Sequence, residues 1–146
     1  MSERVEVTHI LPYAPERVFW RYVDHESWTW WANLGRVTLS RVGSEHRDGE
    51  GALRRISNLG SLVVVEEEVV AFEPLSLMRY RLLDHPAAPL TDHEGEVRFR
   101  PAGQGTEVTW ACRYRPSATA VAPVLRAGLK RLFTRTLGRL ERHGLW

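Results

Sequence analysis

The chain has 146 residues, 43% of them hydrophobic and 26% charged, and its formal net charge at pH 7 is +2. These values are typical of a folded domain; they exclude a disordered chain and give no global reason to expect a nucleic-acid partner. No apolar run is long enough to cross a bilayer, and the first residues lack the layout of a signal peptide. The single cysteine, Cys112, cannot form an internal disulfide, which fits a reducing compartment. We therefore expect one cytoplasmic domain spanning residues 1–146, without stable membrane insertion.

The first part of the chain predicts one strand followed by two short helices. Residues 5–11 alternate between apolar and polar side chains, as a strand does, and Pro12 ends the pattern. Pro15 and the acidic residue after it mark the start of a helix. Residues 24–31 are either a second short helix or a lid loop, and the pattern does not decide between the two.

The middle of the chain shows strand patterns in succession, which together with the first strand gives about seven. The expected strands include residues 37–39 and then span 51–58, 61–72, 77–83, 94–100 and 106–115. Two prolines make the segment 85–91 a loop, and a tight hairpin turn is expected at 58–61.

Beyond residue 119 the apolar spacing changes to steps of three and four, which predicts a long amphipathic helix. Pro123 lies near its start, where proline is tolerated. The last three strands carry apolar and aromatic side chains on one face and charged ones on the other. The helix is the only long apolar stripe available to cover that face. We therefore predict an α+β fold in which a curved antiparallel sheet wraps a long C-terminal helix.

Several aromatic residues on the inner face carry a polar atom. Tyr80, Trp110 and Tyr114 each need a hydrogen-bond partner when buried, whereas a simple packing core favours Leu, Ile and Val. Together they favour an apolar cavity with a few polar contacts. The alternative is that they are large core residues whose polar atoms bind backbone groups.

Two charged residues are expected on the same apolar face. A hairpin turning at residues 59–60 would pair Ile56 with Val63 and Arg54 with Val65, which makes Arg54 and Glu67 diagonal neighbours. A charge pair on an apolar face is costly unless the two groups bind each other or meet water. Our hypothesis is that they orient a polar group of a ligand. The alternative is that they lie at a solvated rim, or that a shifted register places both outside.

The remaining polar residues favour no metal or cofactor site. None of the six histidines lies at a ligand spacing from another, and there is no cysteine cluster, phosphate loop or nucleophile elbow. We therefore expect no bound metal, no cofactor and no recognisable catalytic residue.

The expected C-terminal helix is basic. Its charged residues are Arg126, Lys130, Arg131, Arg135, Arg139 and Arg142, with Glu141 the one acid. A basic amphipathic helix can bind acidic membranes or nucleic acid. A solvated basic face is the favoured interpretation, because the total charge is small.

Three sequence segments give this chain a family resemblance. Residues 10–20 (ILPYAPERVFW), 69–74 (VVAFEP) and 105–110 (GTEVTW) resemble segments of the START-like (SRPBCC) superfamily, and most closely its polyketide cyclase/dehydrase-like group. The resemblance covers nearly the whole chain and implies the helix-grip fold, with a central cavity for lipids, polyketides or other apolar small molecules. Some relatives are cyclases or aromatases and others only carry ligands. No shared catalytic triad is implied.

These observations lead to one functional expectation and two alternatives. We expect the chain to bind or transport a small hydrophobic or amphipathic molecule, and we expect no nucleic-acid partner; a homodimer is one option for its assembly. The first alternative is a cyclase or aromatase, with Arg54 or Tyr80 polarising a carbonyl and Glu67 acting as general base. The second is an interaction module that uses the basic helix. The predicted ligand-binding residues are Trp28, Trp31, Arg54, Glu67, Tyr80, Phe99, Trp110, Tyr114, Leu129 and Phe133.

Overall fold

The computed structural model describes residues 1–58 and 63–145, and seven strands of this part form one antiparallel sheet. The strand order is β1-β7-β6-β5-β4-β3-β2. The strands are β1 (Glu3–Leu11), β2 (Arg36–Arg41), β3 (Leu53–Asn58), β4 (Val63–Glu73), β5 (Leu77–Leu82), β6 (Leu90–Ala102) and β7 (Gly105–Pro116). The expected number of strands and the antiparallel pairing are confirmed.

The helices form two groups in the sequence, one after β1 and one after β7. Helix α1 (Pro15–Tyr22) begins at a proline with Glu16 in its first turn, as the sequence predicts. The 3₁₀ turn η1 (His25–Ser27) and helix α2 (Trp28–Trp31) follow, so the stretch that sequence left open is helical. The 3₁₀ turn η3 (Thr119–Val121) leads into the long helix α3 (Ala122–Arg139), and a π-helical turn, η4 (Leu140–Gly144), ends it.

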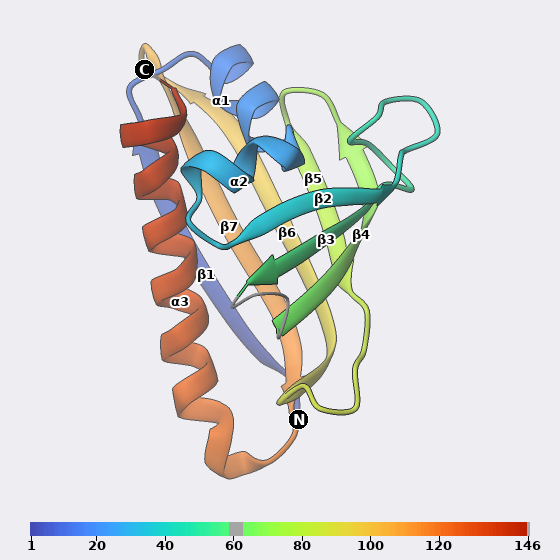
Figure 1. Cartoon of the computed structure of the whole chain (residues 1–146). Coiled ribbons are helices and arrows are strands. Elements are labelled where there is room, and N and C mark those ends of the chain that lie inside the picture. The colour runs from blue at the N-terminus through green and yellow to red at the C-terminus, as the bar shows by residue number, and fades with distance from the viewer. Residues whose placement is uncertain (59–62, 146) are drawn as a thin grey trace.

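Helix α3 runs along β1 and β7, and the sheet curves away from it on the other side (Figure 1). Helices α1 and α2 cover the end of the sheet near the C-terminus, and α3 starts at the opposite end, near the N-terminus (Figure 1). This arrangement confirms the helix-grip architecture. Among the helices of the described residues, none is long and apolar enough to span a membrane.

One predicted boundary was wrong. The segment 85–91 was expected to be a loop throughout, but β6 already begins at Leu90 and is much longer than the expected strand at 94–100. A bulge between Thr91 and Glu94 accounts for the missed pattern, since it breaks the alternation on which the prediction rests. Asp92 in this bulge has φ of 51°, in the left-handed region that short polar residues tolerate.

The core lies between the inner face of the sheet and α3. The alternating residues of β6 and β7 point inward as expected, and Val97, Phe99 and Trp110 are buried there. The second half of α3 supplies Phe133 and Leu137. Burial of each such side chain contributes about 1.5–3 kcal/mol to folding.

The outer face of the sheet is a ladder of exposed ion pairs, which the sequence also predicts. Arg79 and Arg98 both bind Glu96, and Glu68 accepts hydrogen bonds from Arg41 and Arg81. Because these groups are exposed or half-exposed, each pair adds little to stability.

Candidate ligand-binding site

Arg54 and Glu67 lie directly opposite each other on β3 and β4. The predicted register, with Arg54 opposite Val65, was wrong by two residues. Asn58 pairs with Val63, so four residues rather than two separate the strands, and the turn predicted at 58–61 lies largely outside the described residues. A shift of two keeps every side chain on its face, which is why the inward direction of both charges was predicted correctly.

The guanidinium of Arg54 is deeply buried and tightly held. Its Nε and Nη2 both lie 2.6 Å from Oε1 of Glu67. Its carbon lies 4.8 Å from the ring centroid of Trp28 and 4.5 Å from that of Tyr80, so two aromatic faces enclose the charge. Arg54 is 1% exposed, and Nη1 has no partner among the residues that the structure describes. Burial alone would lower the pKa of this guanidinium, but the charge of Glu67, the two nearby tyrosines and the hydrogen bond to Glu67 together more than offset it, so Arg54 stays charged.

Tyr80 is positioned by its neighbours on β6 and β7. Its hydroxyl accepts a hydrogen bond of 2.8 Å from Nε1 of Trp110. Its ring lies across Gly95, where a Cβ atom would approach Cζ of Tyr80 to 2.1 Å. Only glycine leaves room for this ring position, and the position brings Tyr80 against Arg54. Burial raises the pKa of Tyr80 well above its ordinary value, so the phenol stays protonated.

Other buried polar atoms lack partners, and three of the four residues that carry them lie near the charge pair. Within the described part of the chain, no partner is found for the hydroxyls of Tyr22 and Tyr114, for Nδ1 of His93 or for Nε2 of His25. The pKa of Tyr22 is raised and that of His93 is lowered, in both cases mainly by burial. The charges of Arg54 and Glu67 act on both groups. Native proteins pair most buried polar groups, so this cluster is unusual for a plain core.

The burial of the inner side chains differs between the two sides of the Arg54–Glu67 pair. On the side of α1 and α2, Ala52, Val69 and Tyr80 are fully buried, and aromatic rings fill the space. On the other side, apolar residues of β3, β5 and α3 are only half-buried against the core. These are Ile56, Leu82, Leu125, Leu129 and Leu132. We call these five partly exposed side chains the half-open apolar region; Ile56 follows Arg54 on the inner face of β3, and Leu82 lies opposite Glu67.

A groove opens at the same end of the sheet. The pairing of β4 with β5 ends at Glu67 and Leu82, followed by one hydrogen bond from the N–H of Leu83 to the carbonyl of Glu66, and the groove lies beyond this point between β4 and the loop after β5. The groove between them has a volume of about 680 Å³ and includes Val65 and Leu82 of the inner row. That volume is within the range of small-molecule sites.

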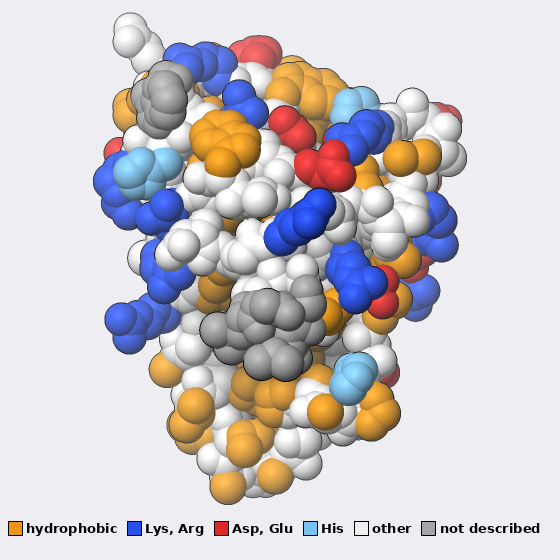
Figure 2. Space-filling view, in the orientation of Figure 1, with side chains coloured by type: hydrophobic (Ala, Val, Ile, Leu, Met, Phe, Trp, Pro, Cys, Tyr) orange, Lys and Arg blue, Asp and Glu red, His pale blue; other side chains and the backbone are white. Residues whose placement is uncertain are grey.

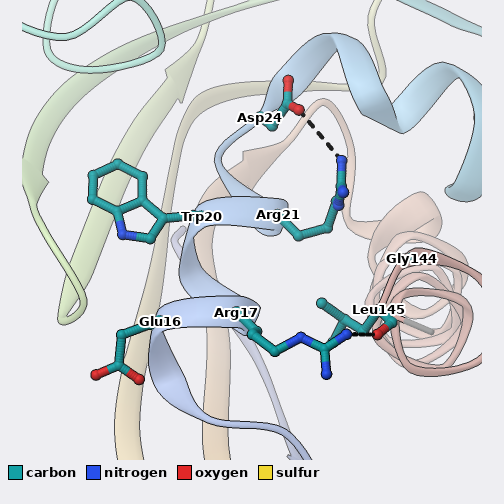
Figure 3. Close-up of a pocket in the computed structure, with 7 residues that line it drawn as sticks. All are labelled: Glu16, Arg17, Trp20, Arg21, Asp24, Gly144 and Leu145. Atoms are coloured by element: carbon teal, nitrogen blue, oxygen red, sulfur yellow. Dashed lines mark hydrogen bonds and ion pairs between the residues drawn. The ribbon is translucent and has the colours of Figure 1, made fainter.

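A second groove on the surface is lined mainly by charged side chains. It lies between α1 and the C-terminal residues, and it is lined by Glu16, Arg17, Trp20, Arg21, Asp24, Gly144 and Leu145 (Figure 3). Arg17 donates to the carbonyl of Leu145, and Arg21 lies 3.5 Å from Asp24. Arg17, Arg21 and Asp24, three of the four charged residues that line this groove, thus bind other groups of the protein.

The structure brings together only part of the predicted site. Trp28, Arg54, Glu67, Tyr80 and Trp110 form one connected group. Phe133 stacks on Trp110 with ring centroids 4.3 Å apart. Leu129 lies on the wall of the half-open region. The role of all of these residues in binding a ligand stays a prediction.

Three predicted residues lie beside this group. Phe99 packs on Phe19 and Tyr22, and Tyr114 lies near His93 on the inner face. Trp31 packs below the end of α3, where Arg139 donates to its carbonyl. Their roles also stay predictions.

Sequence reasoning missed four neighbours of the charge pair. Tyr22 belongs to the apolar stripe of α1, which signalled burial but not its place beside Arg54. His25 and His93 were considered only as metal ligands and were left out of the predicted site, yet both are buried. Gly95 gave no signal, because its role depends on the residue opposite it on β5.

The buried histidine His25 makes stability depend on pH. Burial lowers its pKa from 6.5 to about 4, although Asp48 accepts a hydrogen bond from its backbone N–H and lies 3.1 Å from Nδ1. Between these two values the unfolded chain binds a proton that the folded protein does not, so stability falls as the pH drops through this window. The free energy of unfolding should decrease by up to about 1.4 kcal/mol per pH unit for this group.

Urea denaturation at several pH values between 4 and 7 measures this slope. His25→Asn should flatten it, whereas the same change at the exposed His143 should leave it unchanged. An equal slope in wild type and His25→Asn would show that His25 is not the group responsible.

The sheet order, the long packed helix and the apolar interior that they enclose define a helix-grip protein of the START-like superfamily. The chain belongs to the polyketide cyclase/dehydrase and lipid transport family, whose model matches residues 2–144. Its relatives include uncharacterized protein Rv2574 from Mycobacterium tuberculosis. The two sequences are 26% identical over 135 residues, which cover 88% of this chain and 78% of the relative.

Solved structures show the same fold at low sequence identity. The ZhuI aromatase/cyclase from Streptomyces sp. R1128 superposes with a TM-score of 0.79 at 15% identity, covering 96% of this chain and 92% of that one. A protein from Thermobifida fusca gives 0.78 at 18% identity, covering 94% and 90%. Ara h 8.0201 gives 0.68 at 13% identity, covering 94% and 97%. At these identities the likeness concerns the fold alone.

Proposed function

We propose that this protein binds a small hydrophobic or amphipathic molecule between the first half of α3 and strands β3–β5. The observation that carries the proposal is the position of Arg54. Its buried guanidinium has one nitrogen, Nη1, for which the described residues supply no hydrogen-bond partner, and it lies where the closed aromatic interior meets the half-open apolar region. A carbonyl, carboxylate or similar oxygen of a ligand would accept a hydrogen bond there, while its apolar part would contact leucine and isoleucine side chains.

The family supports this proposal at a general level. Its description combines polyketide cyclases and dehydrases with lipid transport, and both activities require an apolar molecule to be held inside the fold. We propose carriage of an unchanged ligand as the main function, carried out by a single cytoplasmic domain. We propose no nucleic-acid partner.

A cyclase or aromatase reaction is the second candidate, and the buried guanidinium favours it. A charge enclosed by aromatic rings polarises a carbonyl more strongly than one in water. The carboxylate of Glu67, however, is already held by the guanidinium of Arg54, with Nε and Nη2 both 2.6 Å from Oε1. The group expected to act as general base is therefore engaged within the protein, whereas Tyr80 keeps the proton with which it could polarise a carbonyl.

Removal of Arg54 should weaken binding of an anionic apolar probe. Titration with 1-anilinonaphthalene-8-sulfonate, followed by fluorescence, should give a dissociation constant about tenfold or more higher for Arg54→Met, since a hydrogen bond to a charged group is lost. Arg55→Met is the matched control, because Arg55 is the next residue and is exposed on the opposite face.

A third variant tests the apolar wall without touching the charge. Leu129→Trp should fill part of the half-open region and also reduce probe binding. Equal affinities of wild type, Arg54→Met and Leu129→Trp would overturn the proposed location. Conversion of a bound natural ligand into a product of different mass would favour the enzyme over the carrier.

A further inference from the structure

The end of the molecule at which β7 leads into α3 exposes a group of mostly small apolar side chains. Two segments meet there, since the backbone N–H of Ser117 donates to the carbonyl of Pro89 over 2.8 Å. Val124 in the first turn of α3 is 74% exposed. We call this surface the apolar tip; its exposed or half-exposed members are Pro86, Ala87, Ala88, Pro89, Ala118, Ala120, Val121, Ala122, Pro123 and Val124.

The second of the two segments, with the helix α3 that it begins, carries basic residues and no acidic one, whereas Asp84 and Asp92 flank the first. From residue 116 to residue 140 the charged residues are Arg126, Lys130, Arg131, Arg135 and Arg139, and none is acidic. Figure 2 shows this layout, with apolar side chains gathered at the lower end and Lys and Arg side chains along the edge above it. Elsewhere on the surface, by contrast, arginines alternate with glutamates.

Some of these basic side chains are bound to the protein and others are free. Arg126 pairs with Glu3, and Arg139 donates to the carbonyl of Trp31 over 2.8 Å. Lys130 and Arg131 are exposed and form no ion pair with any described residue. Two free positive charges therefore lie on α3 close to the apolar tip, about one to two helical turns beyond Val124.

We propose that the apolar tip and the adjacent face of α3 dock reversibly on an anionic lipid surface. Apolar side chains would enter the interface between headgroups and acyl chains, and Lys130 and Arg131 would bind the anionic headgroups. The charge complementarity singles out this partner, because a protein surface that matched only the apolar tip would need no uncompensated basic stripe. Docking here needs neither the internal site nor any conformational change.

The location also has a consequence for the proposed ligand. The groove of about 680 Å³ is lined by Ala87, Ala88 and Pro89 of the tip, by Val65 and Leu82 of the inner row, and by polar residues that include Glu66 and Asp84. On the proposed function, a protein docked through the tip would bring this groove next to the lipid. An amphipathic molecule could then pass between membrane and protein without crossing water.

Co-sedimentation with vesicles tests the docking surface. Wild type at about 0.1 M salt should bind vesicles of equal parts phosphatidylcholine and phosphatidylglycerol, and should not bind pure phosphatidylcholine. The double variant Lys130→Gln and Arg131→Gln should bind the anionic vesicles about 30-fold more weakly, at roughly fivefold per basic side chain. Val124→Asp should weaken binding similarly although all basic side chains of α3 remain, because it replaces an exposed apolar side chain by a negative charge.

A matched variant removes two charges elsewhere. Arg98→Gln with Arg100→Gln makes the same change in net charge on the outer face of the sheet, and it should bind vesicles as wild type does. Arg54→Met should also bind normally, which separates docking from capture of a lipid in the internal site. Circular dichroism of each variant checks its fold.

Three results would overturn the docking proposal. The first is no binding of wild type to anionic vesicles. The second is an equal loss in the Arg98 and Arg100 variant, which would mean that net charge alone matters. The third is a wild-type dimer that Val124→Asp dissociates without any change in vesicle binding, which would make the tip an interface between two copies of the chain.

Discussion

Glu67→Ala should lower the free energy of unfolding by about 3 kcal/mol. The change leaves Arg54 charged and buried without its carboxylate, and the loss of one partner from a buried pair typically costs about 3–5 kcal/mol. The lower end of that range applies because the Glu67 side chain is 12% exposed, so water can reach the vacated place. Equilibrium denaturation in urea, followed by tryptophan fluorescence, measures the effect.

Two controls separate the buried pair from a general effect of charge. Glu68→Ala removes the neighbouring carboxylate, which pairs with Arg41 and Arg81 on the outer face, and it should cost less than about 1 kcal/mol. Replacement of both Arg54 and Glu67 by Met should recover most of the stability lost in Glu67→Ala, since no unpaired charge remains. Equal losses in Glu67→Ala and Glu68→Ala would show that Arg54 is not buried as described.

Gly95→Ala should also cost about 3 kcal/mol, at the upper end of the usual cost of overpacking. The added Cβ would lie 2.1 Å from Cζ and 2.5 Å from the hydroxyl oxygen of Tyr80, so the ring has to move. Its movement would break the hydrogen bond from Trp110 and uncover one side of the Arg54 guanidinium. The same denaturation experiment measures the loss, and binding of the anilinonaphthalene probe should weaken with it.

The control for Gly95→Ala is a glycine with free space around it. Gly128 lies exposed in the middle of α3, and a Cβ there would meet nothing within 4 Å. Gly128→Ala should therefore stabilise the protein by up to about 1 kcal/mol, because alanine favours the helix. A combination of Gly95→Ala with Tyr80→Ala should cost clearly less than the sum of the two single changes. Full additivity would mean that the ring does not lie over Gly95.

The architecture could be predicted because its signals are local. Alternation in β6 and β7 identified the inner face, and the three-to-four spacing of α3 identified the element that covers it. The strand register could not be predicted, since it depends on the number of residues in the turn and not on the strands themselves. The early start of β6 was missed for a related reason, because the bulge before Glu94 interrupts the period.

The candidate site was predicted to the extent that strand alternation determines it. Two charges on an otherwise apolar face, Arg54 and Glu67, were visible in the sequence, and so was the row of amphipathic aromatics. The enclosure of Arg54 by Trp28 and Tyr80 was not visible, because it joins three separate elements. Gly95 could be understood only once Tyr80 lay opposite it. The apolar tip was not predicted either, because its exposure depends on how α3 packs against the sheet.

A crystal structure of the protein with 1-anilinonaphthalene-8-sulfonate tests the central claim most directly. We predict that the aromatic rings of the probe lie between the first half of α3 and β3, in contact with Ile56 and Leu129. Its sulfonate should then lie within hydrogen-bonding distance of Nη1 of Arg54. A probe bound only on the outer face of the sheet, or in the polar groove beside α1, would contradict the internal site.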